Sequence, residues 1–262
     1  MSINFTYLEK CVTIGLQFGN PLIVSQVVCL SFYRFNALPA RLWAFAMMGL
    51  ARAQMGKVPD IGFWKLCGSG IGEGFTPVPN TAVYAILTTW PSEEIARNRL
   101  SQNALFQRYR NKASENWTVF MATSSVRGEW SGTTPFVESD TQGIGPLAAL
   151  TRATIRPSIL ARFWKRVPNI SKVIGTDPNV LFKIGIGEVP WLHQVTFSIW
   201  PDATQMAQFA RTGPHAEAIK AVRREDWFAE ELYARFAVLS DAGTWNVQSP
   251  LAPHTEKALE SA

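Results

Sequence analysis

The chain has 262 residues, of which 47% are apolar and 17% are charged, and its formal net charge is +5. This composition excludes a disordered chain and favours a globular protein with a large core, built as one large domain or two small ones. The basic balance suits a mildly basic surface, an anionic partner or a membrane surface, and we expect no nucleic-acid partner.

The cysteines and the N-terminus indicate the compartment. Cys11, Cys29 and Cys67 are odd in number and form no CxxC pair, so neither a disulfide framework nor a cysteine-only zinc site is expected. Glu9 and Lys10 stand where a signal peptide needs its apolar stretch. Because no uncharged apolar run reaches the length of a membrane span, we expect a cytoplasmic protein.

The first half of the chain predicts the order β-α-β-β-α-β. Expected strands rich in β-branched and aromatic residues cover 24–35, 62–67, 82–90 and 116–124. Two expected helices cover 37–57 and 92–113. The first helix has an apolar stripe at Leu42, Phe45, Leu50 and Met55, and Ser92 is placed to cap the second.

The second half predicts the same order again. Its expected strands are 146–154, 180–187, 193–200 and 233–240, with a helix over 158–174 and a long helical region after the third strand. The phrase GIGE begins at Gly70 and again at Gly185, and each copy leads into a strand that ends in Trp-Pro. Such an ordered recurrence indicates two diverged copies of one unit.

Further matches support the duplication and predict which positions correspond. Arg34 and Lys65 match Arg152 and Lys183 at a spacing of 118; Trp90 and Trp117 match Trp200 and Trp227 at 110; Trp130 matches Trp245 at 115. We expect Lys65 and Lys183 to occupy equivalent positions on two sheets.

The repeated order is that of the ferredoxin-like unit, whose antiparallel sheet has helices on one face only. The bare face must be buried, and two units in one chain achieve this by packing sheet to sheet and closing a barrel. The predicted fold is therefore α+β, a duplicated ferredoxin-like chain of the dimeric α+β barrel type. The expected divisions are an extension over 1–24, units over 25–131 and 146–246, a linker over 132–145 and a tail over 247–262.

Familiar catalytic motifs are missing, which leaves the three histidines as the informative residues. The sequence contains no GxGxxG, HExxH, GxSxG or zinc-ligand spacing. His254 lies in the tail. His193 begins a strand, and alternation places it on one face with Val195, Phe197 and Ile199.

His215 follows Pro214 at the expected start of a helix and shares a face with Ala218, Ile219 and Val222. The helix macrodipole there disfavours imidazolium, so His215 is expected to be neutral, as an iron ligand must be. At a spacing of 110, His193 and His215 replace Val83 and Leu105 of the first copy. The alternative is that each is a core histidine with a single hydrogen bond.

Other residues are interpreted more simply. The aromatic residues Phe163-Trp164, Trp191 and Trp227-Phe228 are interpreted as core. Arg152, Lys183 and Arg211 are interpreted as surface charges. Any of these three cations could also meet a cofactor that carries carboxylates.

Several long phrases resemble the spheroidene monooxygenase family of carotenoid biosynthesis. They are IGFWKLCGSGIGEGFTPVPNTAVYAILTTWP in the first half, and LTRATIRP, FWKRVPNIS, FKIGIGEVPWLHQVTFSIWPD, GPHAEAI and WFAEELYARF in the second. The resemblance implies an oxygenase that places keto groups at C-2 of acyclic carotenoids such as spheroidene. It also implies haem b, O2 and reduced ferredoxin. Because a carotenoid partitions into membrane and the chain has no expected span, we expect peripheral contact with the inner or photosynthetic membrane, helped by the basic balance.

The resemblance also gives the candidate residues their roles. Haem-degrading monooxygenases of the dimeric α+β barrel superfamily are similar in fold and place the axial histidine on the second helix of the unit, near His215. We therefore expect His215 to ligate the haem iron, Arg211 and Lys183 to bind the cofactor, and His193 and Trp191 to act in catalysis. The reverse assignment of the two histidines stays open. So do a haem-degrading or cofactor-free barrel monooxygenase and a non-enzymatic carotenoid- or lipid-binding barrel.

Overall fold

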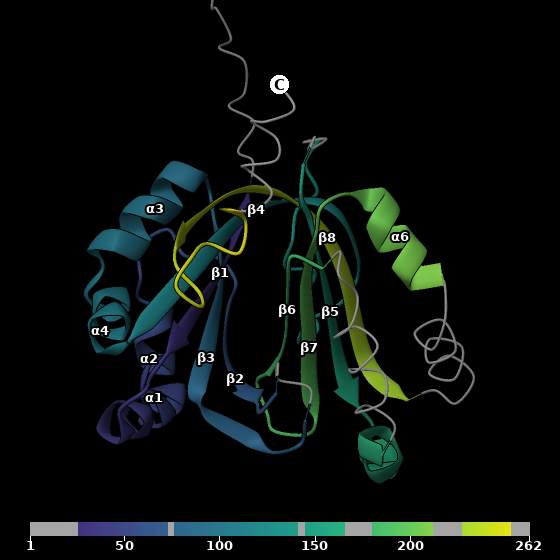
Figure 1. Cartoon of the computed structure of the whole chain (residues 1–262), viewed down its shortest axis with the longest axis horizontal. Helices are drawn as coiled ribbons and strands as arrows, with labels where there is room; N and C mark the ends of the chain where they lie inside the picture. Colours follow the sequence, from purple (N-terminus) through teal and green to yellow (C-terminus); the bar gives the residue numbers. More distant parts are fainter. Residues whose placement is uncertain (1–25, 73–75, 141–144, 166–179, 212–226, 253–262) are drawn as a thin grey trace, which may run out of the picture.

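The computed structural model describes residues 26–72, 76–140, 145–165, 180–211 and 227–252. Eight strands close a barrel in the order β1-β3-β2-β6-β7-β5-β8-β4, and every neighbouring pair is antiparallel. Each half contributes a ferredoxin-like sheet with its helices outside (Figure 1). The predicted α+β barrel is confirmed.

The first unit comprises β1 (Val27–Arg34), α1 (Leu38–Leu50), α2 (Arg52–Met55), β2 (Trp64–Gly70), β3 (Pro79–Trp90), α3 (Glu93–Gln102), α4 (Ala104–Lys112) and β4 (Glu115–Gly128). The second comprises β5 (Leu147–Ile155), η1 (Pro157–Ile159), β6 (Phe182–Gly187), β7 (His193–Trp200), α6 (Ala203–Arg211) and β8 (Phe228–Gly243). The helix expected over 92–113 is two helices, because Asn103 has an extended backbone and caps α4 through the amide of Leu105, at 2.9 Å.

The ends of β3 and β7 correspond as predicted. The indole nitrogen of Trp90 donates to Thr88 Oγ1 at 2.8 Å, and that of Trp200 donates to Ser198 Oγ at 2.9 Å. The helices that follow are capped alike, since Ser92 and Asp202 each accept from the amide three residues on. The spacing of 110 is therefore correct for this strand.

The pairing of β4 with β8 reveals an approximate two-fold axis. Trp117 lies opposite Gly243, and Gly128 lies opposite Leu232. The counterpart of Trp117 is thus Leu232, and the predicted match with Trp227, which precedes β8, is wrong. The match of Trp130 with Trp245 is supported, because these residues stand two places after Gly128 and Gly243.

The predicted equivalence of Lys65 and Lys183 is wrong. Leu66 pairs with Ile86, and Gly185 pairs with Thr196, 110 residues after Ile86. Lys65 therefore corresponds to Ile184 and faces the barrel interior, whereas Lys183 lies on the outer face. A one-residue slip of register reverses the face of every side chain.

The two GIGE phrases do not superpose either. The first begins at Gly70, the last residue of β2, whereas the second begins within β6 at Gly185. The glycines that correspond are Gly68 and Gly187, which pair across the short seam between β2 and β6.

Aromatic side chains fill the barrel interior. Phe32 stacks on Trp117 with ring centroids 5.6 Å apart, and Phe182 lies 4.7 Å from Trp117. The same buried cluster contains Trp130, Phe136, Phe197, Phe236 and Trp245. An eight-stranded barrel is just wide enough to be filled in this way, and these rings pack against one another in the interior.

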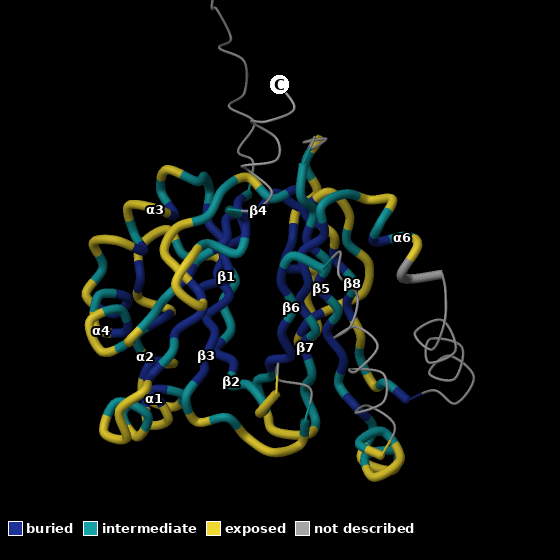
Figure 2. Tube along the Cα trace, in the orientation of Figure 1, coloured by how far each residue is buried: buried dark blue, intermediate teal, exposed yellow. Residues whose placement is uncertain are grey.

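A second core lies between the first sheet and α1–α4. The apolar stripe predicted for the first helix is mostly not its buried face. Ala44 and Met47 are buried, whereas Leu42, Phe45 and Leu50 of the stripe are each more than 60% exposed. Met55, the last residue of the stripe, is buried in α2. Figure 2 shows this exposed side of α1 at one end of the barrel.

Replacing Gly128 by Ala should destabilise the fold. Its φ is +90°, and an added Cβ would collide with the carbonyl oxygen of Glu231. We expect a loss of about 3 kcal/mol in the free energy of unfolding, measured by urea denaturation. Gly49→Ala is the control, because Gly49 is helical with no atom within 4 Å of its added Cβ and should gain about 0.5–1 kcal/mol. Equal effects at both positions would contradict the assignment of Gly128.

Candidate functional site

One end of the barrel is closed by an arginine, a glutamate and a tryptophan. Arg34 forms an ion pair of 3.0 Å with Glu115, and its guanidinium carbon lies 4.3 Å from the centre of the Trp245 ring. The amide of Val247 donates to Glu115 at 2.8 Å. Val247 has a positive φ of 80°, which turns its amide back toward the strand end.

The opposite end has a similar arrangement, built from a different position on the strand. Arg34 pairs with Val83 and Thr154 pairs with His193, so the predicted match of Arg34 with Arg152 is wrong by two residues. Arg152 forms an ion pair with Glu230 and lies 5.8 Å from the centre of the Trp130 ring. The amides of Ser131 and Gly132 donate to Glu230 at 3.1 and 2.7 Å. The interpretation of Arg152 as a surface charge is wrong, since it is only 1% exposed. A motif present at both ends serves to close the barrel.

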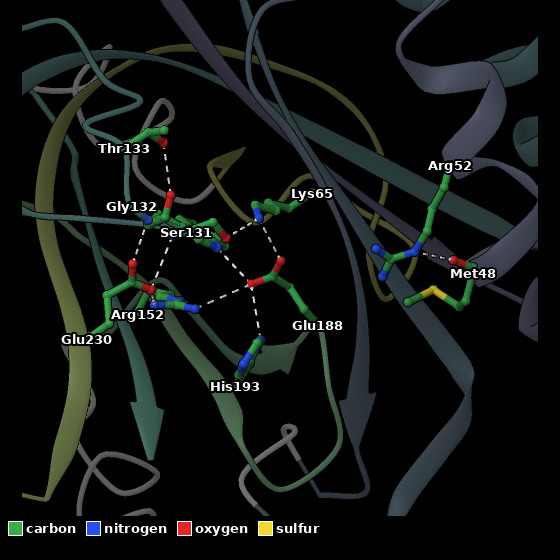
Figure 3. A network of polar contacts seen from close by, with 11 residues as sticks. Met48, Arg52, Lys65, Ser131, Gly132, Thr133, Arg152, Glu188, His193 and Glu230 are labelled. Atoms are coloured by element: carbon green, nitrogen blue, oxygen red, sulfur yellow. Dashed lines mark hydrogen bonds and ion pairs between the residues drawn. The ribbon is translucent and has the colours of Figure 1, made fainter. Parts of the chain in front are cut away.

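Three further residues occur at the second end only: Lys65, Glu188 and His193 (Figure 3). Lys65 Nζ lies 2.9 Å from Glu188 Oε1, and the Trp130 indole nitrogen donates to Glu188 Oε2 at 2.7 Å. His193 Nδ1 lies 3.7 Å from Glu188 Oε2. The first unit has Val83 at the position of His193, so these groups are additions to the shared closure.

Charge is balanced in this network, because two cations face two carboxylates. Burial is the largest influence on His193 and lowers its pKa; Arg152 and Lys65 lower it further, against the opposing effect of Glu188. Burial acts to raise the pKa of Glu230, but the Gly132 and Ser131 amides and Arg152 outweigh it, so that pKa is lowered. The folded protein therefore favours a neutral imidazole at His193.

The lowered pKa of His193 predicts a loss of stability in mild acid. As pH falls below about 6.5, the unfolded chain takes up a proton at this residue before the folded chain does. The melting temperature should therefore fall between pH 7.5 and 5.5, and His193→Gln should reduce that fall. Glu230, with a pKa below its ordinary value of 4.5, contributes only in stronger acid. An unchanged pH dependence in His193→Gln would contradict this prediction.

An apolar cavity of about 220 Å³ opens beside the network. Trp191 stands at its edge with a positive φ of 67°, and its indole nitrogen donates to the Pro77 carbonyl at 2.8 Å. The carbonyl of Trp191 accepts from the Trp164 indole at 3.2 Å. Among the described residues that line the cavity, Glu188 is the only acidic one.

The outer face of the second sheet differs sharply from that of the first. Where Leu66 pairs with Ile86, the second sheet has Gly185 paired with Thr196. The same substitution of small or polar residues recurs elsewhere: Cys29, Tyr33, Tyr84 and Phe120 of the first sheet correspond to Ala149, Ala153, Gln194 and Arg235. The first face packs its large side chains against helices, whereas the second face carries smaller or polar side chains at the corresponding positions.

The structure distributes the predicted site residues over three places. Lys183 lies on the outer face of β6. His193 lies near Glu188 in the inner network. Trp191 lines the cavity. The structure therefore does not bring His193 and Lys183 together. Arg211 ends α6, and His215 lies outside the described residues.

Sequence reasoning missed the network itself. Glu188, the last residue of the second GIGE phrase, was the residue that could have indicated the network. A turn between two strands does not require a carboxylate for its own geometry, so a glutamate there can indicate a contact elsewhere. Glu230 and Trp130 are too distant in the chain to suggest a contact. Among the described residues, no cluster of three or more His, Cys, Asp or Glu could hold a metal ion.

Two ferredoxin-like units that close one antiparallel barrel define the dimeric α+β barrel class, here within one polypeptide. Solved structures agree: an aldoxime dehydratase in complex with butyraldoxime gives a TM-score of 0.57 at 10% identity, covering 88% of this chain and 86% of that one. A second aldoxime dehydratase gives 0.55 at 10% identity, covering 84% of each chain. These similarities concern the fold alone.

Sequence relatives are more specific. A spheroidene monooxygenase of Cereibacter sphaeroides is 48% identical over 229 residues, covering 86% of this chain and 71% of that protein. One of Rhodobacter capsulatus is 45% identical, covering 89% and 98%, and one of Rubrivivax gelatinosus is 36% identical, covering 79% and 80%. No family model matches the chain. The chain belongs to the spheroidene monooxygenase family and is thus related to oxidoreductases.

Proposed function

We propose that the chain is a haem-dependent carotenoid monooxygenase that introduces keto groups at C-2 of acyclic carotenoids such as spheroidene. O2 is the oxidant and reduced ferredoxin the electron donor. The carotenoid substrate follows from the family, and the cofactor site follows from one observation: the outer face of the second sheet has small side chains where the first sheet has large ones.

The residues of this face fit a flat macrocycle that carries two carboxylates. The small side chains of Gly185 on β6 and Thr196 on β7 are proposed to give the depth that the ring needs. Lys183 and Arg235 add positive charge to the same face, where a carboxylate is stabilised. The first sheet, with Leu66 and Ile86 at the corresponding pair, has no such depth.

The proposed iron ligand is His215, on the segment that follows α6. Arg211, at the end of α6, and Lys183 are proposed to pair with the haem carboxylates. Bound haem supplies the activation of O2. Since proteins ligate iron through neutral imidazole, the expected position of His215 near a helix N-terminus suits this role.

The apolar cavity is the proposed entrance for the carotenoid. Its walls are mostly apolar, with Trp191 at the edge and Gln194, on the outer face of β7, at the back. Gln194 belongs to the same face as Lys183, so the cavity leads toward the proposed cofactor. His193 is proposed to act from the other side of the sheet, by positioning Glu188 at the inner end of the cavity.

The test uses purified protein, haem, O2, reduced ferredoxin and detergent-solubilised spheroidene. The expected result is a product heavier by one inserted oxygen with loss of two hydrogens, formed only with haem present. Turnover without haem would favour a cofactor-free oxygenase, and bound pigment without O2 consumption would favour a carrier. Destruction of the haem during turnover would favour a haem-degrading enzyme.

A further inference from the structure

Large apolar side chains are exposed mainly at one end of the molecule. Of the eleven exposed among the described residues, eight lie on α1, on the turn between β2 and β3, or on the turn between β6 and β7. These eight, here called the apolar rim, are Leu38, Leu42, Phe45, Leu50, Ile71, Val78, Val189 and Trp191. The other three are Val137, Leu239 and Val247, so the concentration is not a general property of the surface.

The apolar rim is one continuous surface. Phe45 and Met48 of α1 line the same cavity as Pro77, Val189 and Trp191 from the two turns. The hydrogen bond from Trp191 to Pro77 joins the turns directly. Figure 1 shows α1 and both turns at the same end of the barrel.

Basic residues flank the rim, and acidic residues are missing from its helices. Residues 37–59, which include α1 and α2, contain Arg41, Arg52 and Lys57 but no Asp or Glu. Residues 157–165 contain Arg162 and Lys165 and again no acidic residue. A helix with an exposed apolar face and a basic border has the chemistry of one that lies in the headgroup region of an anionic bilayer.

We propose that the apolar rim docks on an anionic lipid bilayer, with α1 lying in the plane of the headgroups. Among the described residues, no helix is long and apolar enough to cross a membrane, so docking through the rim would be peripheral. Leu38, Leu42 and Phe45 are each at least 63% exposed, and their insertion removes apolar surface from water.

Docking places the mouth of the cavity against the hydrocarbon of the bilayer. A long apolar substrate then passes from lipid into the protein past Trp191 without entering water. This consequence rests on the proposed function, whereas docking itself does not, and the two are tested separately.

Flotation of the full chain with lipid vesicles tests the docking. Vesicles of phosphatidylcholine with roughly one third phosphatidylglycerol are compared with phosphatidylcholine alone, at low and high salt. The test variant is Leu38→Gln with Leu42→Gln, which keeps the charge and does not change the cavity lining. Val137→Gln with Leu239→Gln is the matched control away from the rim.

We expect the wild type and the control to float with anionic vesicles, and the test variant to bind roughly tenfold more weakly or less. All three should oxidise detergent-solubilised spheroidene equally, and the test variant should be slower only with substrate in vesicles. Binding by the test variant equal to wild type would overturn the proposal. So would a wild-type dimer that the test variant abolishes without any vesicle binding. Absence of turnover in detergent, with vesicle binding intact, would count against the proposed function alone.

Discussion

Replacing Arg152 by Met should destabilise the protein by about 3 kcal/mol, because a buried ion pair that loses one partner leaves an uncompensated charge. The Arg152 side chain is 2% exposed and joins Glu230 and Glu188. Removing it also takes the cation from beside Trp130. The measurement is the free energy of unfolding from urea denaturation at neutral pH.

Arg34 supplies the matched control, because it occupies the corresponding closure at the other end of the barrel. Its side chain is 28% exposed, so Arg34→Met should cost about 1 kcal/mol or less. Adding Glu230→Gln to Arg152→Met should recover part of the loss, since the partner charge is then gone. Similar losses at Arg34 and Arg152, with no recovery in the double variant, would contradict the buried-network interpretation.

Filling the outer face of the second sheet should weaken haem binding strongly. Gly185→Leu with Thr196→Ile restores the side chains that the first sheet has in the paired positions Leu66 and Ile86. Overpacking by a single branched side chain costs about 1–3 kcal/mol, so the pair should weaken haem binding by roughly tenfold or more. The folded state should persist, because the first unit already accommodates these residues.

Thr196→Val is the control for this variant. Valine has nearly the volume of threonine but lacks its hydroxyl. If haem binding requires only space above Thr196, the variant should keep its haem. If haem binding requires the Thr196 hydroxyl, the variant should lose it. Haem content per chain, measured by absorption after gel filtration, distinguishes the outcomes. Retention of haem by the filled variant would place the cofactor elsewhere.

Local signals made part of the fold predictable. The Trp-Pro at the end of β3 and β7, with a capping residue next, is set by neighbouring residues, and the structure agrees there. The equivalence of Lys65 and Lys183 was not predictable in the same way, because identical residues one register apart face opposite sides of a sheet. Identical residues in the two halves identified the repeated unit, but they did not determine the register of its strands.

Burial of the charged network depends on contacts that no local pattern carries. Arg152 stands in an alternating run of small residues, and its partners Glu230 and Trp130 come from β8 and from the turn after β4. The apolar stripe of α1 did not predict its buried face, for a related reason. Helical periodicity identifies an apolar face but not the surface that this face contacts. Leu42 and Phe45 are exposed in the described part of the chain.

The most direct measurement is a titration of haem into the purified protein, followed by absorption, in the wild type and in His215→Ala. We predict that the wild type binds one haem per chain with the spectrum of a histidine-ligated iron, and that His215→Ala loses this spectrum. His193→Ala should keep it, because His193 faces the inner network with Glu188. A normal spectrum in His215→Ala together with its loss in His193→Ala would contradict the assignment of the cofactor to the outer face of the second sheet.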